Sequence, residues 1–276
     1  MSSNELPEYL YHYTTVEAIT LILKNHKIRF RPLSLLDDKQ EEMAQDYSTL
    51  SRFVYVSSWT DSDKESVPMW KMYSDMRSGV RIKTRTNMFH IYMITAEESR
   101  EIYRKTNGKV DIPAEARLPS PLKWCDVLER NYVTAFAGVN DYVRQVIYTD
   151  EIDQLIPALL QKNDDGSISV DFNKLGMHKS TAWEFQHEWR YLFYAFMLKA
   201  NTNGAYKCTL SDMNNPKILW GIDNIDIEIT DDAFNDMEIV MSPKISESNR
   251  TILNLLKKEY NPSLRICESS LNGLIR

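Results

Sequence analysis

Carboxylate and amide side chains lie within an aromatic segment, residues 183–190, of this 276-residue chain. In an extended conformation three of them would project from one face, because side chains alternate along a strand: Glu184, Gln186 and Glu188. A buried carboxylate is costly unless it is paired or has a chemical role. The sequence leaves two interpretations open for Glu188: an ion pair with Lys179 or Arg190, or a part in catalysis.

His12 is a second group with chemical potential. It lies in Tyr11-His12-Tyr13-Thr14-Thr15, which is typical of a strand, and helical spacing follows over residues 16–25. A histidine there can point into a cleft and donate hydrogen bonds to ribose hydroxyls. The alternative is a core histidine bonded to a backbone carbonyl.

Hydroxyl and aromatic side chains form a third group. Ser57 and Ser58 precede Trp59 in a predicted strand over residues 53–60, and Pro68 suits the first turn of a helix. That helix carries Trp70 and Tyr73, which share a face because they are three residues apart. They could form a wall for a flat ring, or they could simply pack in the core.

Several common site types are not indicated. The chain contains no G-x-x-x-x-G-K-[ST], G-x-G-x-x-G, G-x-S-x-G or H-E-x-x-H sequence, and its five histidines are dispersed. The sequence therefore predicts no metal site. Residues 77–109 are rich in Lys and Arg, which favours a docking face for a polyanion or an ordinary solvated surface.

Composition predicts an ordinary globular protein, with 43% hydrophobic and 26% charged residues and a net charge of -6. Three widely spaced cysteines suit a reducing cytoplasm, and no apolar run approaches the roughly 18 residues of a membrane span. We expect a soluble α+β protein with a mixed or antiparallel sheet. Its expected elements include a strand over residues 188–194 and a helix over residues 151–162.

Taken together, these segments resemble the DUF2971 family of bacterial proteins. The specific parts are the Y-H-Y-T block at Tyr11, the M-W-x-x-Y block at Met69, and the K-x-x-x-W-x-x-x-x-E-[WY]-R block that starts at Lys179. The resemblance extends over most of the chain, from about residue 9 to residue 268.

A more distant resemblance is to ADP-ribosyltransferases, including their nucleic-acid-modifying toxins. Those enzymes place His or Arg on the first strand, hydroxyls on the next, and a Gln-x-Glu or Glu-x-Glu pair near a late strand. The resemblance implies one ADP-ribosyltransferase-like domain over residues 1–276, with a mixed or antiparallel sheet core and flanking helices. Residues 110–175 would form an insertion, in which the sequence gives the weakest indications of helices and strands. It also implies NAD as co-substrate, with no metal.

The same resemblance implies roles for individual residues. Glu188 would stabilise the oxocarbenium-like transition state on the nicotinamide ribose, and Gln186 would orient the acceptor. The NAD-binding residues would be His12, Tyr13, Thr14, Ser57, Ser58, Trp59, Trp70 and Tyr73. The acceptor-binding residues would be Arg81, Lys83, Arg85 and Arg190.

The resulting hypothesis is an NAD-dependent ADP-ribosyltransferase, a bacterial toxin or phage-defence effector that modifies a base of RNA or DNA. A neutralising antitoxin protein would be its partner. Two alternatives stay open. One is a non-catalytic nucleotide- or nucleic-acid-binding module. The other is a metal-independent RNase, with His12, Glu188 and Arg190 as acid, base and phosphate clamp.

Overall fold

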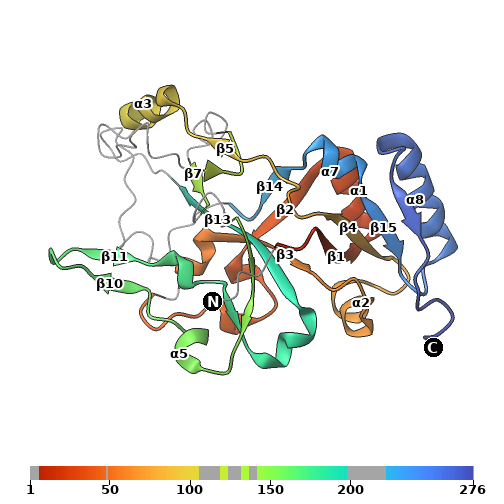
Figure 1. Ribbon diagram of the computed structural model, residues 1–276, viewed down its shortest axis with the longest axis horizontal. Helices are drawn as coiled ribbons and strands as arrows, with labels where there is room; N and C mark the ends of the chain where they lie inside the picture. The colour runs from red at the N-terminus through yellow and green to blue at the C-terminus, as the bar shows by residue number, and fades with distance from the viewer. Residues whose placement is uncertain are drawn as a thin grey trace.

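A computed structural model describes residues 6–47, 49–105, 119–123, 132–136, 142–197 and 222–275 (Figure 1). Its α-helices are α1 (Val16–Asn25), α2 (Val67–Tyr73), α3 (Ala96–Lys105), α5 (Ile152–Leu155), α7 (Asp231–Asn235) and α8 (Glu247–Tyr260). Its 3-10 helices are η1 (Leu33–Leu35), η2 (Lys39–Glu42), η3 (Leu50–Phe53), η5 (Phe172–Lys174) and η6 (Thr181–Gln186). The protein is therefore a mixed α+β structure with several helices, as the sequence predicts.

Within the described ranges, ten strands form one large sheet that is mostly antiparallel. They are β1 (Tyr9–Thr15), β2 (Lys27–Pro32), β3 (Val54–Thr60), β4 (Gly79–Arg85), β7 (Tyr132–Ala135), β8 (Val143–Gln145), β13 (Glu188–Met197), β14 (Ile225–Glu228), β15 (Glu238–Met241) and β16 (Arg265–Cys267). The remaining strands form two-stranded sheets: β5 (Tyr92–Met93) with β6 (Pro119–Ser120), β9 (Ile147–Tyr148) with β12 (His178–Lys179), and β10 (Leu160–Lys162) with β11 (Ile168–Val170).

The strand β3 lies at a split in this sheet. Along one edge it pairs with β13 over its full length, from Glu188 opposite Thr60 onward. Along the other edge β1 pairs only at Thr60, and β2 pairs only with Tyr55 and Val56. Among the described residues, the segment 57–59 thus has no strand partner on that second edge. The split leaves room for side chains from β1 to reach the β3 backbone.

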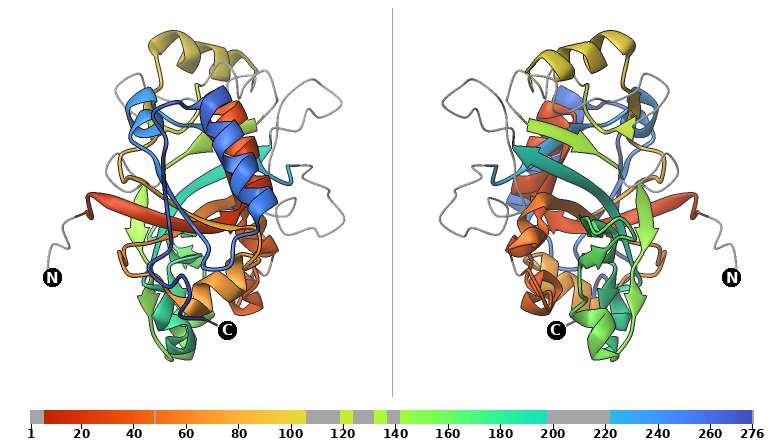
Figure 2. Two further views of the ribbon diagram at one scale, coloured as in Figure 1. Left: turned by 90° about the vertical axis from the view of Figure 1, so that its right-hand side faces the viewer. Right: turned by 90° about the vertical axis from the view of Figure 1, so that its left-hand side faces the viewer.

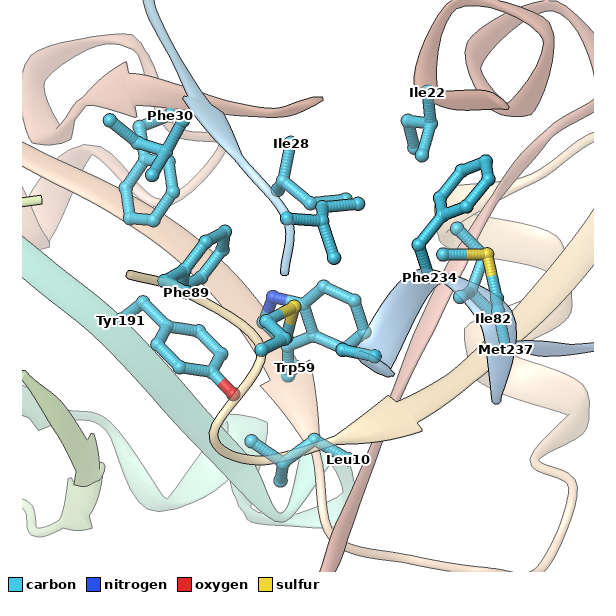
Figure 3. Packing of buried hydrophobic residues seen from close by; sticks show 14 of the residues in the cluster. Leu10, Ile22, Ile28, Phe30, Trp59, Ile82, Phe89, Tyr191, Phe234 and Met237 are labelled. Atoms are coloured by element: carbon cyan, nitrogen blue, oxygen red, sulfur yellow. The ribbon is translucent and has the colours of Figure 1, made fainter. Parts of the chain in front are cut away.

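One continuous apolar core covers the sheet face that packs against α1. Figure 3 shows Phe30, Phe89 and Tyr191 close together, with Trp59 beside them. The Tyr191 ring is perpendicular to that of Phe89 at 4.9 Å between centroids. Aromatic rings therefore fill the space behind β3 and hold that strand in place.

The helices α1 and α8 lie side by side on the sheet (Figure 2). Thr15 caps α1 by accepting a hydrogen bond from the Ala18 amide at 3.3 Å, and His26 ends it in the left-handed conformation. The apolar face of α1, including Ile19 and Leu23, is fully buried. Because β1 runs directly into α1, this packing fixes the position of the His12 strand.

The predicted helix over residues 151–162 is wrong, and the extended conformation considered for residues 184–186 is not present. Residues 151–162 are helical only over α5, because Pro157 lacks the amide that a helix needs and the following chain turns into β10. Residues 181–186 form the 3-10 helix η6 rather than an extended segment, with Ser180 as N-cap and His187 in the left-handed conformation. Glu184 is consequently exposed and does not share a face with Glu188.

The predicted single domain with an insertion over residues 110–175 stays a prediction. Parts of that insertion, residues 110–118, 124–131 and 137–141, lie outside the described residues. Its described part includes the β10–β11 hairpin, which projects from the body of the molecule (Figure 1). In the portions that the structure describes, no helix has the length and apolar character needed to cross a membrane.

Candidate functional site

A pocket opens where the sheet splits, between β1, β3, α2 and the start of β13. Many of the residues that the sequence predicts for NAD binding and catalysis line it: His12, Tyr13, Ser58, Trp59, Tyr73, Gln186 and Glu188. Arg190, which the sequence predicts for acceptor binding, lines it too. These residues come from segments more than a hundred positions apart in the chain. The fold therefore brings the three predicted blocks to one place.

The floor of the pocket is a buried cluster of four charged side chains, Glu41, Lys179, Glu188 and Arg190, which we call the charged floor. Glu188 accepts hydrogen bonds from Arg190 Nε at 2.6 Å and from Lys179 Nζ at 3.0 Å. Arg190 also donates to Glu41, and Lys179 Nζ lies 3.2 Å from Glu41. The two positive and two negative charges balance, which is the condition for burying them together.

The electrostatics of the charged floor keep Glu188 ionised. Burial alone would raise the pKa of Glu188, but the charges of Arg190 and Lys179 outweigh it. Together with hydrogen bonds from Arg190 and the Ser58 hydroxyl, they lower the pKa of Glu188 to about 2. Glu188 is therefore a fixed negative charge at neutral pH and a poor proton acceptor. Of the two interpretations that the sequence left open, the ion pair is present, and it involves both predicted partners.

His12 reaches across the split to the β3 backbone. Its Nδ1 lies 2.8 Å from the Ser58 carbonyl oxygen, which can only accept, so Nδ1 carries the proton. Burial lowers the pKa of His12 despite this bond, so the ring is neutral at pH 7 and Nε2 is an acceptor. The sequence predicted a histidine that donates to ribose hydroxyls. The neutral tautomer instead suits Nε2 to accept a hydrogen bond from such a hydroxyl.

Aromatic side chains form the walls of the pocket. Trp59 lies 5.0 Å from the His12 ring, while Tyr73 and Trp183 are half-buried and line the opening. The Tyr73 hydroxyl accepts a hydrogen bond from Gln186 Nε2 at 2.5 Å. Burial raises the pKa of Tyr73 to about 12, so it stays protonated. We call Tyr73 and Trp183 the aromatic rim.

Three residues predicted to bind NAD lie elsewhere. Thr14 and Ser57 line a neighbouring groove rather than the pocket. Trp70 is fully buried and contacts Tyr13 edge-on at 4.8 Å between ring centroids. Since Trp70 turns into the core while Tyr73 lines the pocket, the two do not form a common stacking wall.

The predicted acceptor-binding residues are dispersed. Arg81 is buried with its guanidinium 4.6 Å from the Tyr11 ring, and Lys83 lies 4.5 Å from the Tyr9 ring. Arg85 is exposed and pairs with Asp236 at 2.9 Å. Arg190 is entirely inaccessible within the charged floor. A buried arginine cannot serve as a surface contact for a polymer, so Arg190 belongs to the pocket floor.

Sequence reasoning missed the acidic residues of the pocket. Glu41 is 5% exposed, although it lies in a polar segment that reads as surface. Asp37 and Asp38 line the opening nearby. Nothing in their spacing marks them, because η1 and η2 are short and carry no apolar periodicity. Among the described residues, no cluster of His, Cys, Asp and Glu has a geometry that could hold a metal ion.

Comparison with known protein families gives one match. Residues 69–191 match the family described as "Protein of unknown function (DUF2971)". The similarity to the DUF2971 family is confirmed for this segment of the chain. The DUF2971 match includes Tyr73, Lys179 and Glu188, and it ends before α8 and begins after β1 and β3. Searches of curated proteins and of solved structures found no match.

Proposed function

We propose that this pocket cleaves NAD and transfers its ADP-ribose, as in the ADP-ribosyltransferases that the sequence resembles. One observation carries the proposal: His12, Ser58 and Glu188 come from adjacent strands of the split sheet and line one pocket. The Ser58 hydroxyl bonds the Glu188 carboxylate, and the Ser58 carbonyl orients His12. This juxtaposition is what the resemblance requires of its three motifs.

The chemical character of the pocket fits the nicotinamide end of NAD. The aromatic rim offers flat faces for the nicotinamide ring. Asp37 and Asp38 place negative charge at the opening, where the cationic ring would enter.

Glu188 has a defined role in this proposal. The bond between C1′ of the ribose and the nicotinamide nitrogen breaks, and its electron pair leaves with nicotinamide. The ribose gains positive charge as that bond breaks, so a fixed carboxylate stabilises the transition state more than the ground state. A lone pair of the acceptor then forms the new bond to C1′, and the acceptor proton passes to solvent. With a pKa of about 2, Glu188 acts through its charge and does not take that proton.

In this proposal Gln186 positions the acceptor. Lys179 Nζ donates to its Oε1 at 2.9 Å, and its Nε2 donates to Tyr73. These two bonds fix which end of the amide is oxygen and which is nitrogen. The preference for a nucleic-acid acceptor comes from the resemblance, in which Glu at this position suits arginine acceptors and Gln does not.

The proposal is tested by measuring nicotinamide release from NAD by the purified protein, alone and with RNA, DNA or cell lysate. We expect release by the wild type and a loss of at least about 100-fold in Glu188→Gln, the size expected when a key electrostatic group is removed. Thermal unfolding of both proteins shows whether the variant is folded. Equal release by a folded Glu188→Gln variant would refute the assigned role.

A second candidate function is a nucleotide-binding module without catalysis. It is favoured by the complete ion pairing of Glu188, which accounts for that residue without any reaction. This candidate predicts saturable binding of NAD with no release of nicotinamide under any condition.

A further inference from the structure

A second cavity adjoins the pocket. It is an open groove of about 1300 Å³ between α1, β2 and β3, which we call the β2 groove. The groove and the pocket share His12, Ser58 and Tyr73, so they are continuous at the split in the sheet. The groove is larger than the pocket and open to solvent, so it can hold a ligand that extends beyond the pocket.

The wall of the β2 groove formed by β2 is basic. Ile28, Phe30 and Pro32 face the core, so the alternate residues all face the groove and are exposed: Lys27, Arg29 and Arg31. Side chains on one face of a strand recur at roughly 7 Å, which sets these cations in a row. A row of cations is unusual in a protein with a net charge of -6 and is the pattern expected of a polyanion site.

These cations are available to a ligand. Among the described residues, Lys27 and Arg31 form no ion pair. Arg29 donates two hydrogen bonds to Asp226, at 2.9 and 3.1 Å, and both side chains are solvent-exposed, so a phosphate at Arg29 would compete with this pair. Asp37, at the junction with the pocket, is the other carboxylate in the groove. The predicted basic strand β4 differs, since Arg81 is buried and Arg85 is paired.

The lining of the β2 groove also includes exposed apolar side chains. Leu21 of α1 and Leu35 of η1 line it and are 47% and 53% exposed. Exposed leucines beside a row of cations offer a surface for bases next to a track for phosphates. Single-stranded nucleic acids are bound by basic grooves that also carry rings for base stacking, and Tyr73 and His12 supply such rings at the junction with the pocket.

We propose that the β2 groove binds a single-stranded nucleic acid as the acceptor. Lys27, Arg29 and Arg31 contact successive phosphates, Leu21 and Leu35 contact bases, and one base lies at the junction near His12, Ser58 and Tyr73. A single strand is favoured over a duplex because a base inside the stack would first have to be flipped out to reach the junction. The acceptor role rests on the proposed function, whereas the binding itself does not.

The test measures binding without NAD, so its outcome does not depend on whether the pocket cleaves NAD. The probes are fluorescein-labelled 20-nucleotide single strands of RNA and of DNA and the corresponding duplexes, titrated at several salt concentrations. The variant Lys27→Gln/Arg29→Gln/Arg31→Gln removes the basic row. The variant Lys244→Gln/Lys257→Gln/Lys258→Gln removes the same charge from residues that line neither cavity.

We expect the β2 variant to weaken single-strand binding and to reduce the slope of log K against log salt by about 2, the value for three lost phosphate contacts. The control variant should change the affinity by less than about twofold. Equal weakening by both variants, tighter binding of the duplexes, or no binding of either single strand at low salt would overturn the proposal. If neither single strand binds at low salt, the basic groove would suit an acidic protein instead. A difference in affinity between the single-stranded RNA and the single-stranded DNA would identify which polymer the groove binds.

Discussion

The charged floor and the aromatic rim belong to one pocket but differ in almost every physical respect. The floor is buried, and each of its four side chains contacts an oppositely charged neighbour. The rim is half-exposed, and its contact with the floor is made through Gln186 and through Lys179, whose Nζ lies 4.8 Å from the Trp183 ring. The floor is therefore built to hold charge in place, and the rim is free to adapt to a ligand.

Because of this difference, the floor should contribute mainly to fold stability and the rim mainly to ligand binding. Burying charged groups costs several kcal/mol for each ion, which their mutual attraction must offset. Changes in the floor should therefore act first on the stability of the fold. Changes in the rim should act on ligand affinity, because half-exposed side chains add little to the core.

The largest expected effect comes from breaking the floor at Arg190. Arg190→Met leaves Glu41 and Glu188 buried without their main partner, which costs about 3–5 kcal/mol of unfolding free energy. Urea unfolding measures the loss. The double variant Glu188→Gln/Arg190→Met is the control and should recover part of it. A loss below about 1 kcal/mol would show that the floor is not the tight cluster described.

Acid should destabilise the protein through the same cluster. The folded-state pKa of Glu188 is about 2, below its unfolded value of 4.5, so its contribution to stability is present above pH 4.5 and falls as the pH drops toward 2. Thermal unfolding between pH 2 and pH 6 measures this dependence. Glu188→Gln should flatten the curve in that window. An unchanged curve would contradict the assigned ionisation.

A change in the aromatic rim should weaken NAD binding while leaving the stability of the fold largely unchanged. Trp183→Ala removes a stacking surface and should weaken NAD binding about tenfold, corresponding to roughly 1.4 kcal/mol. Equilibrium dialysis with NAD measures the affinity, and urea unfolding measures the stability, which should fall by less than about 1 kcal/mol. A large loss of stability with unchanged affinity would assign Trp183 to the fold.

The smallest expected effect is that of Tyr73→Phe. This change keeps the ring and removes the hydroxyl that accepts a hydrogen bond from Gln186, which costs about 1 kcal/mol. Phe should leave NAD binding within about threefold of the wild type. Tyr73→Ala, which also removes the ring, serves as the comparison and should weaken binding more. Equal effects of the two variants would exclude a role for the ring.

The sequence predicts those parts of the fold that have strong local signals. Periodicity and capping residues identify α1 and α8, and runs of aromatic and β-branched residues identify β1, β3 and β13. The ion pairs of Glu188 with Lys179 and Arg190 can also be predicted, because burying a carboxylate without a partner of opposite charge is energetically costly. These features depend on residues that are neighbours in the sequence or on the general cost of burying a charge.

The remaining features depend on tertiary contacts. Glu41 becomes buried because η2 lies against β12, an arrangement that no local pattern encodes. The β2 groove depends on the split in the sheet. In the sequence, the alternation of Lys27, Arg29 and Arg31 with apolar residues is therefore the same as in any half-buried strand. For the same reason, the sequence predicts acceptor binding by the basic strand β4, although its cationic side chains lie over tyrosine rings.

The central claim is that Glu188 acts in catalysis beyond its place in the charged floor. The matched pair Glu188→Gln and Glu41→Gln tests it, because each removes one carboxylate charge from the same buried cluster. Nicotinamide release and unfolding free energy are measured for both. We predict similar losses of stability, at least a 100-fold loss of release in Glu188→Gln, and a loss of no more than about tenfold in Glu41→Gln. Equal loss of release in the two variants would contradict the claim and leave Glu188 as an ion-pair partner alone.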